Sequence, residues 1–178
     1  MGMVYLDGEI LPEDAARVPA TDPALAWGAG AFEVVRGYNQ RPFQLPAHMD
    51  RLERSARYIG LEPELPDLAP AIERLFRENG LDGGRVRITL TGGGHLIVVV
   101  QGHDPLPPRL YEEGGALGIA PFRRDPRAPL AGYKTLNYLE NMRTRWDAEG
   151  RGELDSLVCG LSGEVLEGTR CNVFSARD

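Results

Sequence analysis

The sequence predicts an α+β fold, and two kinds of periodicity are the main reason. Residues 46–61 and 66–80 place apolar side chains three and four positions apart, which is typical of amphipathic helices. Residues 85–91 alternate between polar and apolar side chains, which is typical of a strand with one buried face. Three glycines turn this strand, and residues 95–101 follow as a second, largely buried strand. We therefore expect a small α+β unit in the first part of the chain.

Each of the two predicted helices has one apolar side. The side of the first helix consists of Leu52, Ala56 and Ile59. The side of the second helix consists of Leu68, Ile72, Leu75 and Phe76. A proline in the first turn and Asn79-Gly80 at the end are typical boundaries for the second helix. Near the N-terminus, Asp7-Gly8 lies between two short apolar runs and favours a hairpin turn.

The second part of the chain predicts a different set of elements. Pro121–Pro129 is polar and rich in proline, which is typical of a connection between domains. Leu136–Ala148 is expected to be a helix with an apolar side. That side consists of Leu139, Met142 and Trp146. Strands are expected over Leu154–Cys159, Glu164–Glu167 and Cys171–Ser175. The predicted domain bounds are 1–117 for an N-terminal domain, 118–130 for a connection and 131–178 for the start of a second domain.

Composition excludes several classes of protein. The 178-residue chain has a net charge of −6 and a pI near 5.2, which argues against nucleic acid or an anionic membrane as the main partner. Two cysteines make no disulfide framework, and the three histidines (His48, His95 and His103) lack metal-ligand spacing. The first residues do not resemble a signal peptide, and no apolar run is long enough to span a membrane. We therefore expect a cytoplasmic protein without a metal site.

Lys134 is the only lysine in the chain, whereas arginine occurs nineteen times. A guanidinium stays protonated and is a very poor nucleophile. A lysine amine can lose its proton when it is buried or lies near another cation, and it can then attack a carbonyl group. A single lysine among so many arginines therefore indicates a chemical role. A lysine that only lies on the solvated surface would give the same count.

Five segments together resemble one enzyme family. They are YLDGEI, GAGAFEVVRGY, FQLPAHMDRLERSA, KTLNYLENM and GEVLEGTRCNVF, in this order along nearly the whole chain. In this set and spacing, the chain resembles the class IV (fold type IV) pyridoxal-phosphate enzymes, which include branched-chain and D-amino-acid aminotransferases and aminodeoxychorismate lyase. The resemblance implies two α/β domains with mainly antiparallel sheets, pyridoxal 5'-phosphate as cofactor, amino-acid and 2-oxo-acid substrates, and a homodimer. Residues 131–178 would then begin the larger, cofactor-binding domain.

The resemblance also implies roles for individual residues. Lys134 matches the lysine that forms a Schiff base with the cofactor aldehyde and then moves the proton from the substrate. Glu167 matches the carboxylate that faces the pyridine nitrogen, and Arg51 matches the arginine that binds the phosphate. Tyr138 matches a tyrosine that hydrogen-bonds the phenolic oxygen of the cofactor. Each of these residue types also occurs as an ordinary core or surface residue.

Two more arginines match positions near the substrate pocket of relatives. They are Arg36, which follows FEVV, and Arg87, in RVRIT. Both are equally compatible with structural ion pairs. The chain departs from the D-amino-acid and lyase branches at Thr91-Gly92-Gly93, where those branches have Thr-Arg-Gly. This departure, with the YLEN and VLEGTRCNVF segments, favours a branched-chain-like L-amino acid as substrate.

The second departure is the length of the chain. Family members continue for roughly another hundred residues after the NVF strand, and that part carries further phosphate-binding groups. We therefore expect a fragment of a normal enzyme, with a C-terminal domain that is incomplete. Three functions remain open. The first is an aminotransferase, the second is aminodeoxychorismate lyase, which would use Lys134 in pyruvate elimination to give 4-aminobenzoate, and the third is a truncated, non-catalytic remnant.

Overall fold

The computed structural model describes residues 2–177 and shows two compact units. The first unit runs to Asp104 and also includes Tyr133–Leu136. The second unit contains Pro105–Gly132 and the chain from Asn137 onward. The expected mixed fold with mainly antiparallel sheets is confirmed. The domain bounds predicted from the sequence stay a prediction. The two compact units describe only how residues pack within this chain, and they group the residues in a different way.

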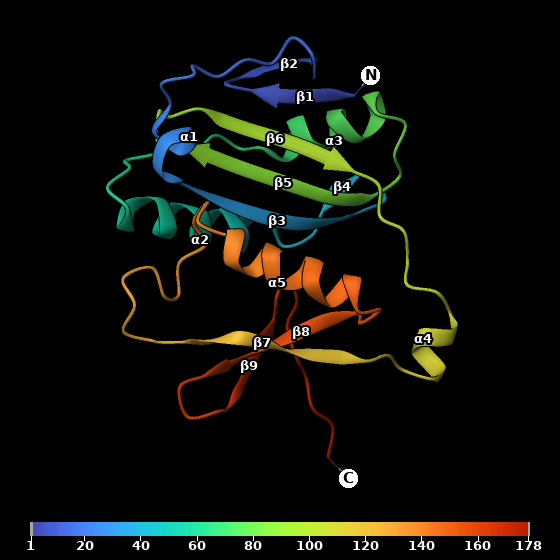
Figure 1. Cartoon of the computed structure of the whole chain (residues 1–178). Helices are drawn as coiled ribbons and strands as arrows, with labels where there is room; N and C mark the ends of the chain where they lie inside the picture. The colour runs from blue at the N-terminus through green and yellow to red at the C-terminus, as the bar shows by residue number, and fades with distance from the viewer. Residues whose placement is uncertain (1, 178) are drawn as a thin grey trace. The chain divides into compact units, whose positions relative to one another are not determined.

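The first unit is built on a six-stranded sheet with the order β2-β1-β6-β5-β3-β4 (Figure 1). Its strands are β1 (Met3–Leu6), β2 (Glu9–Pro12), β3 (Gly30–Tyr38), β4 (Arg41–Pro42), β5 (Gly84–Thr91) and β6 (Leu96–Gln101). Neighbouring strands are antiparallel, and the predicted N-terminal hairpin is β1-β2. The alternation predicted for residues 85–91 is confirmed, since Val86 and Ile88 are fully buried while Arg85 and Arg87 are exposed.

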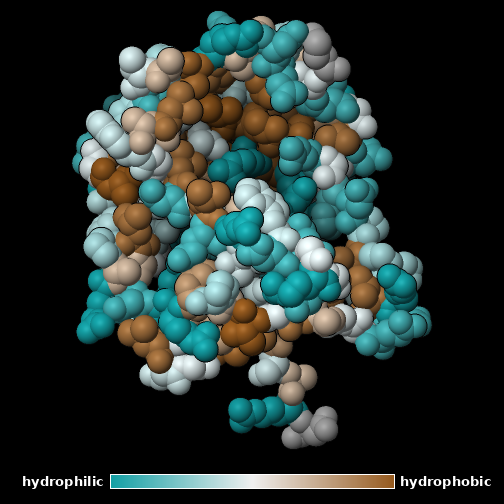
Figure 2. Space-filling model, in the orientation of Figure 1, coloured by the Kyte–Doolittle hydropathy of each residue, from teal (hydrophilic) through white to brown (hydrophobic). Residues whose placement is uncertain are grey.

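Two helices cover one face of this sheet, which Figure 1 shows behind the strands. They are α2 (Leu45–Tyr58) and α3 (Ala69–Glu78), close to the two predicted helices, and a short α1 spans Pro23–Trp27. The predicted apolar sides are buried almost completely in the core, except that Ile59 ends its helix half-buried. Figure 2 shows apolar side chains over β1 and β6 on the face that points away from the helices.

The second unit contains a three-stranded sheet with the order β7-β8-β9. Its elements are α4 (Arg109–Glu112), β7 (Leu117–Arg124), α5 (Leu139–Gly150), β8 (Asp155–Gly160) and β9 (Val165–Gly168). The β8-β9 pair is antiparallel and the β7-β8 pair is parallel. Parallel strands need a crossover connection, and α5 lies in the connection between β7 and β8. No helix in residues 2–177 has both the length and the apolar character that crossing a membrane requires.

Two sequence-based expectations for the second unit are wrong. The connection stays a prediction, but part of it is strand β7, and Pro121 lies where the β7-β8 register shifts, a place that tolerates a missing N–H group. Residues 171–175 are not a strand. The expected apolar side of α5 is also not its buried side, since Leu139 and Trp146 are 70% and 50% exposed. The buried residues of α5 are Asn141, Thr144 and Ala148, which turn a polar side inward.

A short segment around Lys134 extends the sheet of the first unit. Thr135 forms an antiparallel bridge with Ala31, beside the start of β3. Hydrogen bonds of 3.0 Å run from the Leu136 N–H group to the Gly30 carbonyl and from the Phe32 N–H group to the Lys134 carbonyl. Residues 134–136 are therefore fixed on the edge of β3, at the end of that strand which β4 does not cover.

Gly30 is required by the close approach of this segment, so a Gly30→Ala substitution should destabilise the protein. An added Cβ atom would lie 2.6 Å from the Leu90 carbonyl oxygen and 2.5 Å from the Leu136 side chain. We expect the free energy of unfolding, measured by urea denaturation, to fall by about 2 kcal/mol. The control is Gly102→Ala, whose Cβ would make an ordinary 3.6 Å contact and should change stability by less than about 0.5 kcal/mol. Equal stability of the two variants would contradict the prediction.

Candidate active site

Arg51 lies on α2 and is held by a buried carboxylate from the sheet. Its Nε and Nη2 atoms donate to Glu33 on β3 over 2.5 and 2.7 Å, a bidentate arrangement. His48, one turn earlier on α2, contacts the same carboxylate through Nδ1 at 2.8 Å. The Glu33 side chain is completely buried, whereas the Arg51 side chain is 45% exposed. The guanidinium is therefore fixed in orientation by Glu33 while part of it stays accessible to an anion.

Charge keeps Glu33 ionised in this position. Burial raises the pKa of Glu33, but hydrogen bonds from Arg51 and His48 lower it, and the net pKa lies below the ordinary value. The hydrogen bonds to Glu33 raise the pKa of Arg51 in turn. Because an isolated charge is costly to bury, the pair is expected to behave as one unit. The sequence singles out Arg51 but not Glu33, whose place beside apolar strand residues resembles that of an ordinary sheet residue.

Lys134 is positioned by groups of the first unit. Its carbonyl is bound to β3, as described above, and its N–H group donates to the Ser55 hydroxyl of α2 over 3.2 Å. The Nζ atom lies 4.7 Å from the ring centre of the buried Phe32. The Arg87 guanidinium lies 4.1 Å from the same ring. Two cations therefore share one aromatic neighbour, and the backbone of the lysine is fixed from both the sheet and the helix.

Arginines gather on the face of the sheet that points away from α2 and α3. Arg36 on β3 lies directly opposite Arg85 on β5, and Val34 lies opposite Arg87. Like charges on directly opposed residues repel each other, so this register is unfavourable by itself. Arg36 also lies over the Tyr38 ring at 5.2 Å. The arrangement makes a positive surface on which an anion would relieve the repulsion. The sequence predicts Arg36 and Arg87 as candidates, and the register adds Arg85.

The loop at Thr91-Gly92-Gly93 is tied to a buried carboxylate. Asp22 is 3% exposed and accepts hydrogen bonds from the Thr91 hydroxyl, the Gly93 N–H and the Ala24 N–H. Burial raises the pKa of Asp22, yet these bonds outweigh it, so the net pKa is lowered. A Cβ on Gly92 would lie 2.8 Å from the Ala29 carbonyl oxygen. The loop thus has no room for a side chain at the position where related branches have arginine.

The second unit contains Glu167 and Tyr138. Glu167 lies on β9, is exposed, and its Oε1 atom is 3.7 Å from Nη2 of Arg124 on β7. The Tyr138 hydroxyl donates to the Thr169 carbonyl over 2.8 Å, and Asn141 donates to the same carbonyl. Burial and the charge of Glu167 raise the pKa of Tyr138. Tyr138 precedes α5, so the helix start and the segment after β9 share one hydrogen-bond network.

Asp155 on β8 secures the segment that follows Glu167. Its carboxylate accepts hydrogen bonds from the backbone and side chain of Thr169 and from the Ser156 N–H group. The Cys171 thiol points to the same carboxylate at 3.5 Å. Burial raises the pKa of Asp155, but these hydrogen bonds bring it below the ordinary value. Three residues that hold the candidate site residues in place could not be predicted from the sequence, because no motif marks a residue whose role is to position another. They are Asp155, Asn141 and Arg124.

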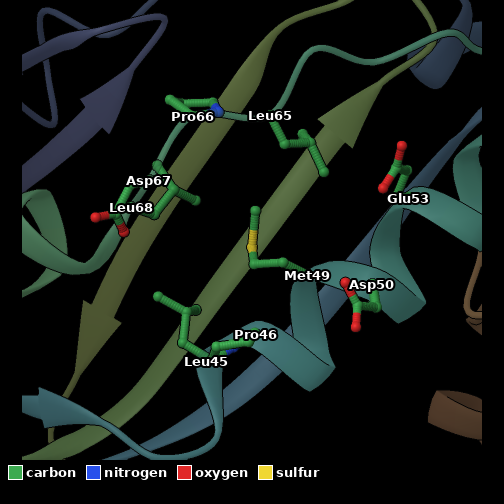
Figure 3. Close-up of a pocket in the computed structure, with 9 residues that line it drawn as sticks. All are labelled: Leu45, Pro46, Met49, Asp50, Glu53, Leu65, Pro66, Asp67 and Leu68. Carbon is green, nitrogen blue, oxygen red and sulfur yellow. The ribbon is translucent and has the colours of Figure 1, made fainter.

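A groove in the first unit is not part of this chemistry. It has a volume of about 310 Å³ and lies between the start of α2 and the segment before α3 (Figure 3). Met49, Leu65 and Leu68 give it apolar walls, and three carboxylates stand around it. None of the residues that line it is a predicted site residue. Of those predicted residues, Arg36, Arg51, Arg87 and Lys134 belong to the first unit, and Tyr138 and Glu167 belong to the second.

Comparison with known proteins gives the family. The sequence profile described as "Amino-transferase class IV" matches residues 30–178, which is most of the chain. The chain belongs to this family. The fold expected from the resemblance is thereby confirmed as fold type IV. The roles of the individual residues stay predictions.

Relatives within the family have different activities. A curated protein of Mycobacterium tuberculosis, "Bifunctional aminodeoxychorismate lyase / D-amino acid transaminase", is 31% identical over 99% of this chain and 66% of its own length. A solved branched-chain aminotransferase from Thermoproteus uzoniensis, with norvaline, is 26% identical with a TM-score of 0.79, over 94% of this chain and 63% of that one. A solved hypothetical aminotransferase from Mycobacterium tuberculosis, with alpha-ketoglutarate and PMP bound, is 30% identical with a TM-score of 0.74, over 95% and 66%.

The chain is shorter than these proteins. It spans about 65% of the length of the first curated relatives that it matches. The relatives show the enzyme family to which the chain belongs.

The Glu33–Arg51 pair predicts how stability depends on pH. Because the folded pKa of Glu33 is lowered, its contribution is complete above the unfolded value of about 4.3 and is lost as the pH falls through the folded pKa. We expect Glu33→Gln to lower the free energy of unfolding by about 2 kcal/mol at neutral pH. The difference from the wild type should shrink at acidic pH, as measured by urea denaturation across pH.

The matched control is Glu53→Gln. This substitution removes a carboxylate from an exposed pair with Arg57 on the same helix. Its effect should stay below about 0.5 kcal/mol. A Glu33→Gln effect of the same size, or one that grows as the pH falls, would show that the buried pair does not stabilise the fold.

Proposed function

We propose that this chain belongs to a pyridoxal-phosphate-dependent aminotransferase that uses Lys134. The reaction moves an amino group between an amino acid, with a branched-chain-like L-amino acid favoured, and a 2-oxo acid. The observation that carries the proposal is the placement of the only lysine, whose backbone is fixed on the edge of β3 and whose amine lies beside Phe32. Arg51 is fixed on a neighbouring helix that contacts the same segment. Family membership supports the reaction class.

Pyridoxal 5'-phosphate fits the donor set of this chain. A solved relative contains PMP, and a second solved form is described as PLP-bound. The first unit supplies an amine for an aldehyde and a half-exposed guanidinium for a phosphate. The second unit supplies a carboxylate for a ring nitrogen and a phenol for a ring oxygen. When bound, the cofactor supplies an electron sink for the bond broken at the substrate carbon.

Arg51 would bind the phosphate, and Glu33 would aim it. A guanidinium offers a planar fork of donors, which suits a phosphate better than a flexible ammonium does. The edge of the fork that Glu33 occupies is fixed, and the exposed part of the side chain is available to the anion. Because Glu33 is a single negative charge, it orients the cation without using all of its donors.

Lys134 would hold the cofactor covalently and then move the proton. Its amine must be neutral when it attacks a carbonyl or takes a proton from the substrate Cα atom. The Arg87 guanidinium lies over the same Phe32 ring and is a second cation in that neighbourhood. The rigid backbone of residues 134–136 would keep the amine near the same position through both steps.

Glu167 would keep a proton on the ring nitrogen. A carboxylate beside the ring nitrogen favours the protonated ring, and the Arg124 guanidinium lies 3.7 Å from Glu167. Tyr138 would donate to the ring oxygen, and for this its hydroxyl would exchange the Thr169 carbonyl for the new acceptor. Asp155 would keep the segment after Glu167 in place during this exchange.

The substrate carboxylate would bind to the arginines of the sheet face. Arg36 and Arg87 are the candidates from the sequence, and the opposed pair Arg36–Arg85 adds charge that an anion would compensate. Val34 lies opposite Arg87 and is partly exposed, so an apolar side chain would find an apolar neighbour there. This combination of charge and apolar surface adds support for the branched-chain-like substrate that the sequence favours.

Aminodeoxychorismate lyase activity is the second candidate. The bifunctional relative supports it, because that protein is described with both lyase and D-amino-acid transaminase activity. Against it stands the closed loop at Gly92, which has no room for the arginine of the lyase branch. A non-catalytic remnant is the third possibility from the sequence. The cytoplasmic location and the homodimer stay predictions.

The first test is the absorbance of the protein after addition of pyridoxal phosphate, with and without borohydride. We expect a band at the edge of the visible range that Lys134→Ala lacks, and a mass increase on the peptide that contains Lys134 after reduction. Since the chain has no other lysine, the only other reactive amine is the N-terminus. The Lys134→Ala variant measures that background directly. A folded wild-type protein that gives only this background would contradict the proposal.

The substrate is tested on the same sample. Addition of an L-branched-chain amino acid to the loaded protein should remove the band and release the matching 2-oxo acid. Aminodeoxychorismate should leave it unchanged, without release of pyruvate. Release of pyruvate and 4-aminobenzoate would favour the lyase, and a response only to a D-amino acid would contradict the L preference.

A further inference from the structure

One side of α2 contacts three different parts of the candidate site. Arg51, Ser55 and Tyr58 are spaced four and three residues apart, so they lie on the same side of the helix. Arg51 binds Glu33 of β3, Ser55 binds the Lys134 backbone, and Tyr58 contacts the residue before Lys134. The arginine and the lysine of the candidate site are thus connected through one rigid element of the same unit.

Ser55 is unusual for a helix residue. It is 1% exposed, although serine is a weak helix former that is common at helix ends and on surfaces. Its oxygen accepts the N–H group of Lys134, which is 79 positions away in sequence. A buried serine in the middle of a helix usually bonds to its own helix backbone. Here the hydroxyl is directed at the backbone of the lysine.

Tyr58 supports the same segment one turn later. Its ring stacks on the Tyr133 ring with centres 3.6 Å apart and an angle of 13° between the planes. Tyr58 is 47% exposed, so the pair lies at the surface of the unit and is not part of the main core. Ser55 and Tyr58 therefore make two independent contacts from α2 to consecutive residues, 134 and 133.

We propose that Ser55 is a positioning residue for Lys134, with Tyr58 as its support. The inference rests on the proposed function, since it assigns Ser55 to the reaction of that lysine. The hydroxyl fixes the backbone of Lys134 at a set distance from Arg51, one turn away on the same helix. The phosphate of the cofactor and its reactive aldehyde are joined through one aromatic ring and a short arm, so the two protein groups that bind them have to stay within a limited range of separations. Ser55 maintains that separation from the lysine side.

Removal of the Ser55 hydroxyl should affect the aldehyde end of the cofactor and the phosphate end differently. Loss of the Ser55 hydroxyl loosens Lys134 and leaves the contacts between Arg51 and Glu33 unchanged. The covalent reaction of the amine should then suffer, while non-covalent binding through the phosphate should not. Pyridoxamine phosphate separates the two, because it has the same phosphate but no aldehyde for the lysine to attack.

The first experiment needs no cofactor. Hydrogen exchange of the Lys134 amide, measured by NMR on the full chain, should be about three- to tenfold faster in Ser55→Ala than in the wild type. Alanine is the better helix former, so the helix itself should persist. Asn79→Ala is the matched control. Asn79 is a partly buried residue of the same unit, and its side chain forms hydrogen bonds with the backbone of Met3 and Leu75. It should leave exchange at Lys134 unchanged.

The second experiment measures function. Ser55→Ala should slow the formation of the borohydride-trapped adduct at Lys134 by about tenfold. Its affinity for pyridoxamine phosphate should stay within about twofold of the wild type, because the phosphate contacts are intact. Tyr58→Leu should act in the same direction with a smaller effect, and it provides the test if Ser55→Ala fails to fold.

Each outcome decides the proposal. Unchanged Lys134 exchange and unchanged trapping in both variants would overturn it. So would a parallel loss of trapping and of pyridoxamine phosphate affinity, since that would indicate general damage to the unit. If the wild-type protein forms no adduct at all, the proposed function fails. The exchange experiment then still shows whether Ser55 holds the Lys134 backbone.

Discussion

The buried ion pair between Glu33 and Arg51 is the interaction on which the candidate site depends. A carboxylate that is fully removed from water needs a charged partner, and Arg51 meets this need only if α2 lies in one orientation against β3. That orientation also sets the direction of Ser55 and the place of Tyr58. Through them it sets the path of the segment that contains Lys134. One buried carboxylate inside the sheet thus helps to determine where Lys134 lies.

The second unit uses the same principle with other residues. Asp155 is almost fully buried and collects hydrogen bonds from the residues that follow Glu167. Asn141 lies between Arg124 and the Thr169 carbonyl and joins strand, helix and loop. In both units, the exposed groups that could meet a ligand are held by buried groups whose own charge or polarity has to be satisfied. The exposed groups are therefore preorganised before any ligand binds.

Sequence periodicity predicted the first unit well because its elements bury apolar side chains. The helix residues Leu52 and Ile72 and the strand residues Val86 and Ile88 all lie in the core, as the spacing requires. The same reasoning failed for α5, where a polar network turns inward and the apolar residues stay exposed. Hydrophobic pattern carries no information about hydrogen bonds between distant segments. The family motifs supplied Lys134, Arg51 and Glu167, which no pattern of hydrophobicity would find.

The supporting residues could not be predicted for a related reason. Ser55 and Glu33 have roles only through partners that are far away in sequence, and one chain alone does not reveal such pairs. The polar, proline-rich segment 121–129 is typical in sequence of a connection between domains. In the structure its first residues belong to β7, and Pro121 lies where the β7-β8 register shifts. These are cases in which tertiary context decides between two local possibilities.

The bridge between Ala31 and Thr135 joins residues that are more than a hundred positions apart. During synthesis on a ribosome, β3 leaves the exit tunnel long before the residues that complete its edge. For that interval the start of β3 exposes unpaired backbone groups, which are a template for association with other chains. Contacts of such long sequence separation also form late and slowly in folding. The segment that contains Lys134 is thus among the last parts of its sheet to be placed.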